Sequence, residues 1–402
     1  MTKIIIKNVR IFDSEDVLQP SNVVITRSED RIQDPMDDGS AAETSDIVVD
    51  GKGCTLIPGL IDVDVNIKGV NAALRTFASH GVTTVIDLSS NTEQNQALRV
   101  YAAGKQGLPT VLSCGTEAAP SRDHQPRLYD NPDKTVIRTR EEAISYVSSR
   151  ASGPDQSDFI KVVVDAQSLT DELLKIIVDA AHAHKKMTIA RASRKASYHR
   201  AMEAGFDIFV HAPLDEPLDA ELAREMAAQK KVFVPTLSML RNRARQAAPI
   251  GQVVPTGRGQ PTLQRREERQ IADGHPTDPG PVSRTTYENA AESVRVAYEA
   301  GVTICAGTTA NMIPGDQIPF GESLHEELRL LVEAGMAPLD VLRSATCLAA
   351  KAFRLQDRGI VRGGLRADLL LIEGNPLEDI AVTRRIRKVW IQGRPLGPET
   401  SE

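Results

Sequence analysis

Apolar, β-branched runs alternate with helical patterns through the middle of the chain. Eight such runs predict strands, at residues 56–66, 82–88, 109–114, 159–164, 187–192, 206–211, 231–236 and 302–307. Between them apolar residues recur with the helical period, for example over 70–80, 93–105, 140–150, 170–185, 195–204, 217–229 and 285–300. This alternation predicts an α/β fold of the (β/α)8 TIM-barrel type. An open doubly wound sheet is the alternative, but no glycine-rich dinucleotide motif follows an early strand.

Short strand patterns also lie at both ends of the chain. Residues 3–13, 21–26 and 47–50 have them near the N-terminus, and residues 366–374 and 387–396 near the C-terminus. We therefore expect a small β-sandwich domain built from residues 1–55 plus 360–402. This domain would flank the barrel, residues 56–359.

One segment interrupts the alternation. Residues 240–284 are rich in Arg, Gln, Pro and Gly and follow the seventh predicted strand. In a barrel this segment begins at the carboxyl ends of the strands, where active sites form. A loop of this length is usually either functional or without fixed structure. Two interpretations stay open: a lid whose arginines face an anionic substrate, and an insertion without a role.

The first barrel strand carries polar groups at alternate positions. Its sequence, LIPGLIDVDVNIKG, runs from Leu56 to Gly69. Alternate residues of a strand share a face. We expect one face to carry Asp62, Asp64 and Asn66, and the other to carry Ile61, Val63, Val65 and Ile67.

Stretches at both ends of the predicted barrel resemble one known family. Pro58 to Asp62 match the PGLID that typically begins the first barrel strand of the amidohydrolase superfamily. The segments GESLHEELRLLVEAGMAPLDVLRSATCLAAKAFRL and DRGIVRGGLRADLLLIEGNPLEDI resemble the C-terminal part of that superfamily. The chain is most similar to the branch of imidazolonepropionase-like hydrolases and prolidase-like dipeptidases. The resemblance implies the barrel fold and leaves the substrate open.

The resemblance also implies metal ligands at the strand ends. These are two histidines on the first strand, an often carboxylated lysine on the fourth, histidines on the fifth and sixth, and an aspartate on the eighth. At these positions the chain has Asp64, Asn66, Lys161, Arg191, His211 and Thr309. Arg191 has no lone pair for a metal, and Thr309 is not a carboxylate base. We therefore interpret the metal site as degenerate and expect no cofactor; a single divalent ion on Asp64, Lys161 and His211 is the alternative.

The same positions indicate candidate catalytic residues. Lys161 in a buried strand needs a carbonate adduct, a carboxylate partner or a role. We expect Lys161 and Arg191 to replace the metals, balanced by Asp64, and to hold a carboxylate or enolate. His211 would act as general acid or base. In a barrel without activity, these polar groups would only satisfy one another.

Other residues are candidates for substrate binding. They are Asn66 and Thr309 at metal positions, together with His325, His199, Tyr198 and Arg127 in helices and loops that follow strands. Helix packing is the alternative for His325, and a surface position is the alternative for His199.

Three functions remain open at this point. The favoured interpretation is metal-independent acid/base chemistry on a small organic molecule, such as isomerisation, cyclisation, elimination or decarboxylation, in secondary metabolism. The first alternative is a metal-dependent hydrolase of C–N bonds in amides or cyclic amides. The second is a non-catalytic pseudoenzyme that binds a small ligand.

Composition and charge limit the expected partners and cellular compartment of the protein. The 402 residues carry a net charge of −6, with 41% apolar and 25% charged residues, as in an ordinary globular protein. We expect no nucleic-acid partner, because there is no basic patch, and no signal peptide or membrane span, because apolar runs are short. Four cysteines far apart in apolar runs predict reduced, buried thiols and a cytoplasmic protein. We expect a small-molecule substrate, and a homo-oligomer is common on this scaffold.

Overall fold

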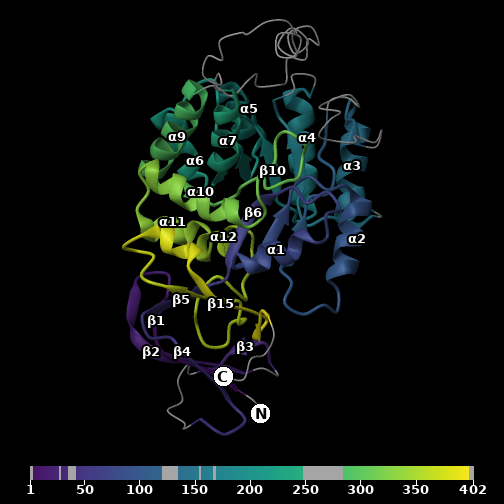
Figure 1. Ribbon diagram of the computed structural model, residues 1–402. Coiled ribbons are helices and arrows are strands. Elements are labelled where there is room, and N and C mark those ends of the chain that lie inside the picture. The colour runs from purple at the N-terminus through teal and green to yellow at the C-terminus, as the bar shows by residue number, and fades with distance from the viewer. Residues whose placement is uncertain are drawn as a thin grey trace, which may run out of the picture.

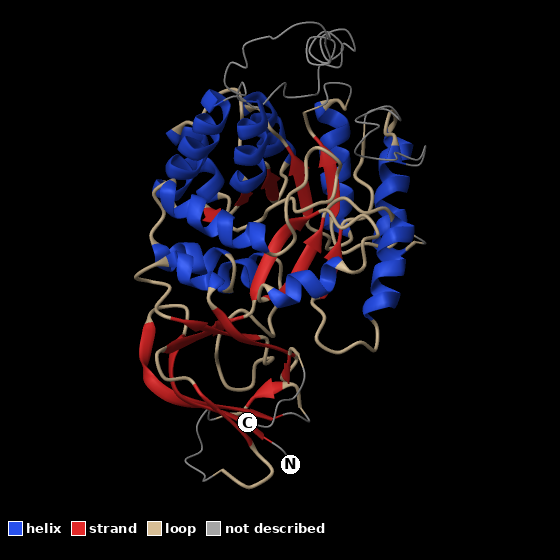
Figure 2. Ribbon diagram, in the orientation of Figure 1, coloured by secondary structure: helices blue, strands red, loops and turns tan. Residues whose placement is uncertain are grey.

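The computed structural model describes residues 3–26, 29–34, 42–119, 135–153, 155–165, 169–247 and 284–397. In these ranges the strands form three sheets. Figures 1 and 2 show the central strands surrounded by helices, with a further sheet below them that contains both ends of the chain.

The predicted central strands are present, and each is shorter than predicted. Their bounds are β6 (Leu60–Val65), β7 (Val82–Asp87), β8 (Thr110–Ser113), β9 (Ile160–Val163), β10 (Thr188–Arg191), β11 (Ile208–Val210), β12 (Val232–Val234) and β13 (Thr303–Ile304). Strands β6 to β8 form one parallel sheet, and β9 to β13 form another.

Backbone bonds connect these two sheets at both of their edges. On one side Ala118, after β8, bridges to Val162 of β9. On the other, Val65 of β6 bridges to Ala310, and the Val63 amide donates to the Ala306 carbonyl at 3.1 Å. This α/β arrangement is consistent with a TIM-barrel-like fold.

Helices cover the outside of these strands. Their bounds are α1 (Ala73–Ser79), α2 (Thr92–Ala102), α3 (Arg140–Ser152), α4 (Asp171–Ala183), α5 (Lys195–Ala204), α6 (Ala220–Ala228), α7 (Leu237–Ala247), α9 (Arg284–Glu299), α10 (Glu322–Glu333), α11 (Pro338–Ser344), α12 (Cys347–Ala352) and the short 3-10 helix η2 (Ile380–Arg384). Local sequence sets several ends: Thr139 and Glu142 form a capping box at the start of α3, and Gly205 ends α5 with a φ of 93°. Within the described ranges, no helix is long and apolar enough to cross a membrane.

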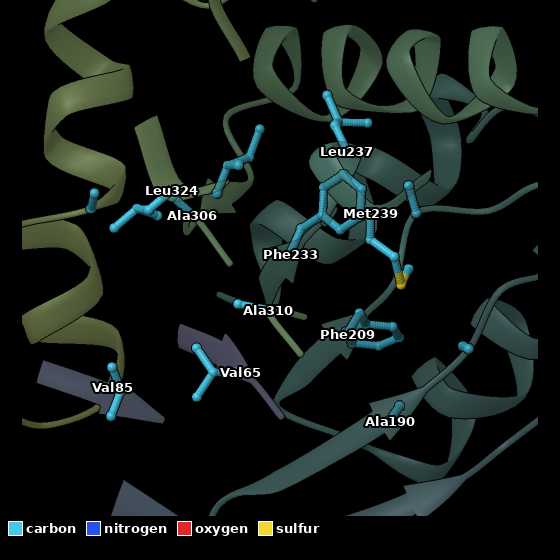
Figure 3. Packing of buried hydrophobic residues seen from close by; sticks show 14 of the residues in the cluster. Val65, Val85, Ala190, Phe209, Phe233, Leu237, Met239, Ala306, Ala310 and Leu324 are labelled. Atoms are coloured by element: carbon cyan, nitrogen blue, oxygen red, sulfur yellow. The ribbon is translucent and has the colours of Figure 1, made fainter. Parts of the chain in front are cut away.

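Apolar residues of the central strands pack in two layers. Ile189, Val210 and Val234 belong to an inner cluster that the strands share with α12 and the residues just after it. Phe209 and Phe233, one position away, belong to the larger cluster that the strands share with the helices. Figure 3 shows these two rings beside Met239 of α7. The alternation expected of strands therefore separates an inner from an outer layer.

The first predicted strand, 56–66, is divided at Gly59. Residues Cys54–Pro58 form β5 in the lower sheet, and β6 begins at Leu60. A side chain at Gly59 would overlap with Thr83, so the chain passes too closely for any other residue. The pairing with β7 also shifts between Asp62 and Val65.

This register shift overturns the expected strand face. Ile61 and Val63 lie in the inner cluster, whereas Val65 and Ile67 lie in the outer one. The four residues therefore do not share a side. A bulge of this kind redirects the residues that follow it, because one extra residue reverses the alternation.

The lower sheet joins both ends of the chain. Its strands are β1 (Lys3–Phe12), β2 (Val17–Thr26), β3 (Arg31–Ile32), β4 (Ile47–Asp50), β5, β14 (Leu369–Glu373), β15 (Ile386–Ile391) and β16 (Arg394–Pro395). The order is β16-β15-β14-β5-β1-β2-β3, with β4 also paired to β1. The strands thus form a single hydrogen-bonded sheet, and the predicted sandwich of two sheets is not confirmed.

The start of the predicted lid is helical. Residues 240–247 belong to α7, and residue 284 begins α9. Leu237, Leu240 and Ala244 recur at helical spacing and pack into the outer cluster, which explains why the loop starts later than predicted. Residues 248–283 lie outside the described ranges, so the lid itself stays a prediction.

Candidate active site

Ionisable side chains from five points of the central sheets meet at the carboxyl ends of the strands. Asp64 comes from β6, Glu117 from the segment after β8, Lys161 from β9, Arg191 from the end of β10 and His211 from the residue after β11. All four candidate catalytic residues from the sequence are in this group. Glu117 is an addition.

Glu117 joins two of the predicted residues. One carboxylate oxygen lies 3.1 Å from Lys161 Nζ, and the other accepts from Arg191 Nη1 at 3.1 Å. The side chains of Glu117 and Lys161 are only 1% and 2% exposed, and that of Arg191 is 13% exposed. Two buried cations therefore share one buried carboxylate, which offsets part of the cost of removing them from water.

The contacts of Lys161 are those of an ammonium group. Nζ donates to the Leu88 carbonyl at 2.9 Å, in addition to its pairing with Glu117. The carboxylate that pairs directly with this buried lysine is Glu117, and the charge of the lysine also acts on Asp64. Sequence reasoning missed Glu117 because it lies in a loop, in SCGTEAAP. The available signal was a single acidic residue among small residues directly after a strand.

His211 is held from several sides. Its Nδ1 lies 2.8 Å from the Thr236 hydroxyl and 3.7 Å from an Asp64 carboxylate oxygen. The Tyr198 hydroxyl donates to the His211 carbonyl at 2.5 Å. Burial lowers the pKa of His211 well below its usual value, and the positive charges of Arg191, Lys161 and Arg243 lower it further. The imidazole is therefore neutral near pH 7.

Asp64 lies beside the imidazole, and the charges of Lys161 and Arg191 act on its carboxyl. Burial raises its pKa to about 6, against the opposing influence of Lys161. The Thr309 hydroxyl donates to its carboxylate at 3.2 Å, and the Thr309 amide donates to its backbone carbonyl at 2.7 Å. This pKa lets the carboxyl exchange a proton near neutral pH.

Two further polar residues follow the carboxyl end of β6. Asn66 is 3% exposed, and its Oδ1 has no hydrogen-bond partner among the described residues. Lys68 is half-buried; burial lowers its pKa, and the negative charge of Glu117 opposes that shift. Asn66 was predicted, whereas Lys68 was missed although it ends the first barrel motif.

The remaining predicted binding residues lie elsewhere. His325 Nε2 donates to the His80 carbonyl at 3.0 Å, and its Nδ1 lies 3.0 Å from the Thr383 hydroxyl; His80 precedes β7. His325 therefore lies at the opposite ends of the strands, and its predicted place in the site is wrong. The alternative of helix packing holds, because α10 needs partners for a buried imidazole.

His199 and Tyr198 lie on α5, outside the strands. The His199 side chain is exposed, so its predicted contact with a buried site is wrong; the surface alternative fits. Tyr198 is fully buried against Phe209 and Phe233 and supports the His211 backbone from below. Arg127 lies outside the described residues.

The cysteines do not offer a nucleophile. All four are free, and Cys54, Cys114 and Cys305 are buried as predicted, whereas Cys347 is half-buried. Burial raises the pKa of Cys114 to about 12, so its thiol stays protonated.

Known proteins resemble this chain, some of them over most of its length. Ochratoxinase from Aspergillus niger is 25% identical over 356 residues, which cover 86% of this chain and 63% of that protein. Imidazolonepropionase from Deinococcus deserti is 34% identical over 102 residues, a quarter of each chain. The crystal structure of a Xaa-Pro dipeptidase with bound methionine superposes with a TM-score of 0.78 at 23% identity, covering 99% of this chain and all of the other.

These relatives bear on the functions left open by the sequence. Metal-independent isomerisation, cyclisation, elimination or decarboxylation finds no support among them, and hydrolysis fits them better. The expected branch, with imidazolonepropionase-like and prolidase-like proteins, is confirmed. Since the model of the amidohydrolase family matches residues 55–396, the chain belongs to the amidohydrolase family.

Proposed function

We propose that this protein is a hydrolase that cleaves a C–N bond in an amide or cyclic amide of a small molecule. Membership of the amidohydrolase family supports hydrolysis. The observation that carries the proposal is the placement of Asp64 and His211, a proton-exchanging carboxyl and a neutral imidazole, beside buried cations. Such a set suits attack by water on a carbonyl.

The proposal includes the architecture around this site. The two parallel sheets would close into one (β/α)8 barrel, residues 56–359, through the bridges at Val65 and Ala118. Residues 1–55 plus 360–402 would form the separate small β domain. The mixed sheet that contains both chain ends supports this division.

The described residues do not fit the two-metal centre common in this family. Arg191 stands where a histidine ligand is implied; it donates to Glu117, and Lys161 is ion-paired with the same carboxylate. A guanidinium and an ammonium offer no lone pair. Among the described residues, no three His, Cys, Asp or Glu side chains form a metal-binding group. We therefore derive no step through a metal.

The side chains present define a hydrolytic sequence. His211 takes a proton from water as the water oxygen bonds to the carbonyl carbon. The C–N bond then breaks, and the departing nitrogen receives a proton from Asp64 or from His211. The products are a carboxylic acid and an amine. Asn66 Oδ1 offers an acceptor for the substrate N–H, and Arg191 offers its charge to a substrate carboxylate.

A hydrolysis assay tests this function. Purified protein is incubated with dipeptides ending in proline and with N-acetyl amino acids, and release of free amine is measured. We expect release that falls at least about a hundredfold in His211→Ala, the usual size of an acid–base contribution. His199→Ala, an exposed histidine, is the matched control and should retain full rate.

Three outcomes would overturn parts of the proposal. Substrate binding without turnover across these probes would favour the pseudoenzyme. One or two equivalents of tightly bound zinc, found by elemental analysis, would contradict the metal-independent route while leaving hydrolysis in place. Variants that keep the full rate would move the site away from His211.

A further inference from the structure

We propose that Thr236, held in place by Glu327, is a positioning residue that keeps the ring proton of His211 on Nδ1 and leaves Nε2 as the basic atom. This inference rests on the proposed function, since it specifies which nitrogen meets the water. Thr236 follows β12 and is fully buried. Neither Thr236 nor Glu327 stands out in the sequence.

The hydrogen bonds of the Thr236 hydroxyl show which ring nitrogen of His211 carries the proton. Its hydroxyl donates to the Pro235 carbonyl at 2.7 Å. The hydroxyl has a single proton, so toward His211 Nδ1, 2.8 Å away, it presents a lone pair. Nδ1 must then carry the proton. The other neighbour of Nδ1, an Asp64 carboxylate oxygen at 3.7 Å, is also an acceptor when ionised.

The backbone of Thr236 is held in an unfavourable conformation. Its φ is 55°, in the left-handed region that β-branched residues rarely adopt. Such conformations persist where the surroundings impose them, often at functional sites. Here the hydroxyl is aimed at the imidazole as a consequence.

Glu327 of α10 holds the backbone of the turn at Thr236 in place. Its carboxylate accepts from the amides of Leu237 at 2.9 Å and Ser238 at 2.6 Å, the two residues that follow Thr236. Glu327 is fully buried. It thereby fixes the first turn of α7 and, with it, the turn that carries Thr236.

A second threonine, also with a positive φ, contacts Asp64, the neighbour of His211. Thr309 has a φ of 54°, and its hydroxyl donates to Asp64 at 3.2 Å. Thr309 contacts the carboxyl and Thr236 the imidazole. Removal of the Thr309 hydroxyl is therefore a matched control that should leave the His211 tautomer unchanged.

The tautomer is measured directly by NMR of protein labelled with ¹⁵N-histidine, because protonated and bare ring nitrogens have distinct shifts. The His211 signals are identified by their loss in His211→Gln. We expect Nδ1–H in the wild type. Thr236→Val should shift the tautomer ratio toward Nε2–H by about tenfold or more, since a buried N–H without an acceptor is costly. Thr236→Ser and Thr309→Val should retain Nδ1–H.

The reverse results would refute the inference. Nε2–H in the wild type, or an unchanged ratio in Thr236→Val, would show that Thr236 does not set the tautomer. Should Thr236→Val fail to fold, Glu327→Gln is tested in its place. The glutamine side chain has an NH2 group where one carboxylate oxygen was, so it cannot accept from both the Leu237 and Ser238 amides and should loosen the turn that carries Thr236. An unchanged tautomer in that variant would likewise count against the proposal.

An activity arm separates this inference from the proposed function. With a dipeptide ending in proline as the probe, Thr236→Val should lower kcat by about a hundredfold with KM changed less than about twofold, and Thr236→Ser should recover most of kcat. If the wild type hydrolyses no probe, the proposed function fails, yet the NMR result still decides the tautomer. If hydrolysis is present and kcat is unchanged in Thr236→Val, the positioning role is refuted.

Discussion

Replacing Glu117 by glutamine should destabilise the protein more than any single surface substitution. The change removes the buried negative charge between Lys161 and Arg191 and keeps the size of the side chain. At 3.1 Å each ion pair is worth about 5 kcal/mol of Coulomb attraction at an effective dielectric constant of about 20. Much of this attraction offsets the cost of burying the charges, so we expect a net loss of about 3–5 kcal/mol in the free energy of unfolding.

The corresponding shift in melting temperature follows from chain length. For 402 residues the unfolding entropy is about 0.8 kcal/mol per kelvin, so the loss amounts to a decrease in Tm of about 4–6 °C. Differential scanning calorimetry or fluorimetry at one scan rate measures it. Glu292→Gln breaks an exposed pair with Arg295 and is the control, expected to change Tm by less than about 1 °C.

A second substitution tests whether the unpaired cations cause the decrease in Tm. Lys161→Met in the Glu117→Gln background removes one of the cations left without its carboxylate, and it should restore part of the lost Tm. An unchanged Tm in Glu117→Gln, or a further decrease in the double variant, would refute the assignment of Glu117 as the shared counter-charge.

Three further predictions concern the first barrel strand and its neighbours. Asp64→Asn should raise Tm at pH 8 and not at pH 4. Burial raises the pKa of Asp64 from its usual value of 3.8 to about 6 in the folded protein, so ionisation of the carboxyl above pH 6 costs about 3 kcal/mol of stability; an equal Tm change at both pH values would contradict this. Thr308→Val removes a hydroxyl that donates to buried Asp62 at 2.7 Å and should lower Tm by about 2–4 °C. Thr308→Ser keeps the hydroxyl and should not lower Tm; a similar decrease in Tm for both variants would exclude the hydrogen bond as the cause. Gly59→Ala should lower stability by about 1–3 kcal/mol through overlap with Thr83, and Thr83→Ala in the same chain should recover part; no recovery would point to another cause.

The positions of the strands and helices followed from local sequence. The period of apolar residues reports which face of an element is buried, and capping residues such as Thr139 report where a helix begins. The break at Gly59 was invisible because nothing in LIPGLIDVDVNIKG reveals that Thr83 passes against its backbone. The single lower sheet was likewise invisible, because strand partners are distant in sequence.

Some residues of the candidate site were also predicted from the sequence, and others were found only in the structure. Asp64, Lys161, Arg191 and His211 were predicted because they stand where the family resemblance implies metal ligands, on strands whose carboxyl ends converge in a barrel. Only the tertiary structure identified Glu117 as the partner of Lys161 and Arg191, since its loop has no periodicity. It also moved His325 to the opposite strand ends, beside the His80 carbonyl.

The sequence by itself therefore determined the family, the order of the central elements and most of the charged residues at their ends. The tertiary structure decided which of these charges are paired, which nitrogen of His211 faces Thr236, and which side of β6 each residue occupies. The physical reason is that burial and hydrogen bonding depend on distances between segments far apart in the chain, and those distances leave no trace in local sequence patterns.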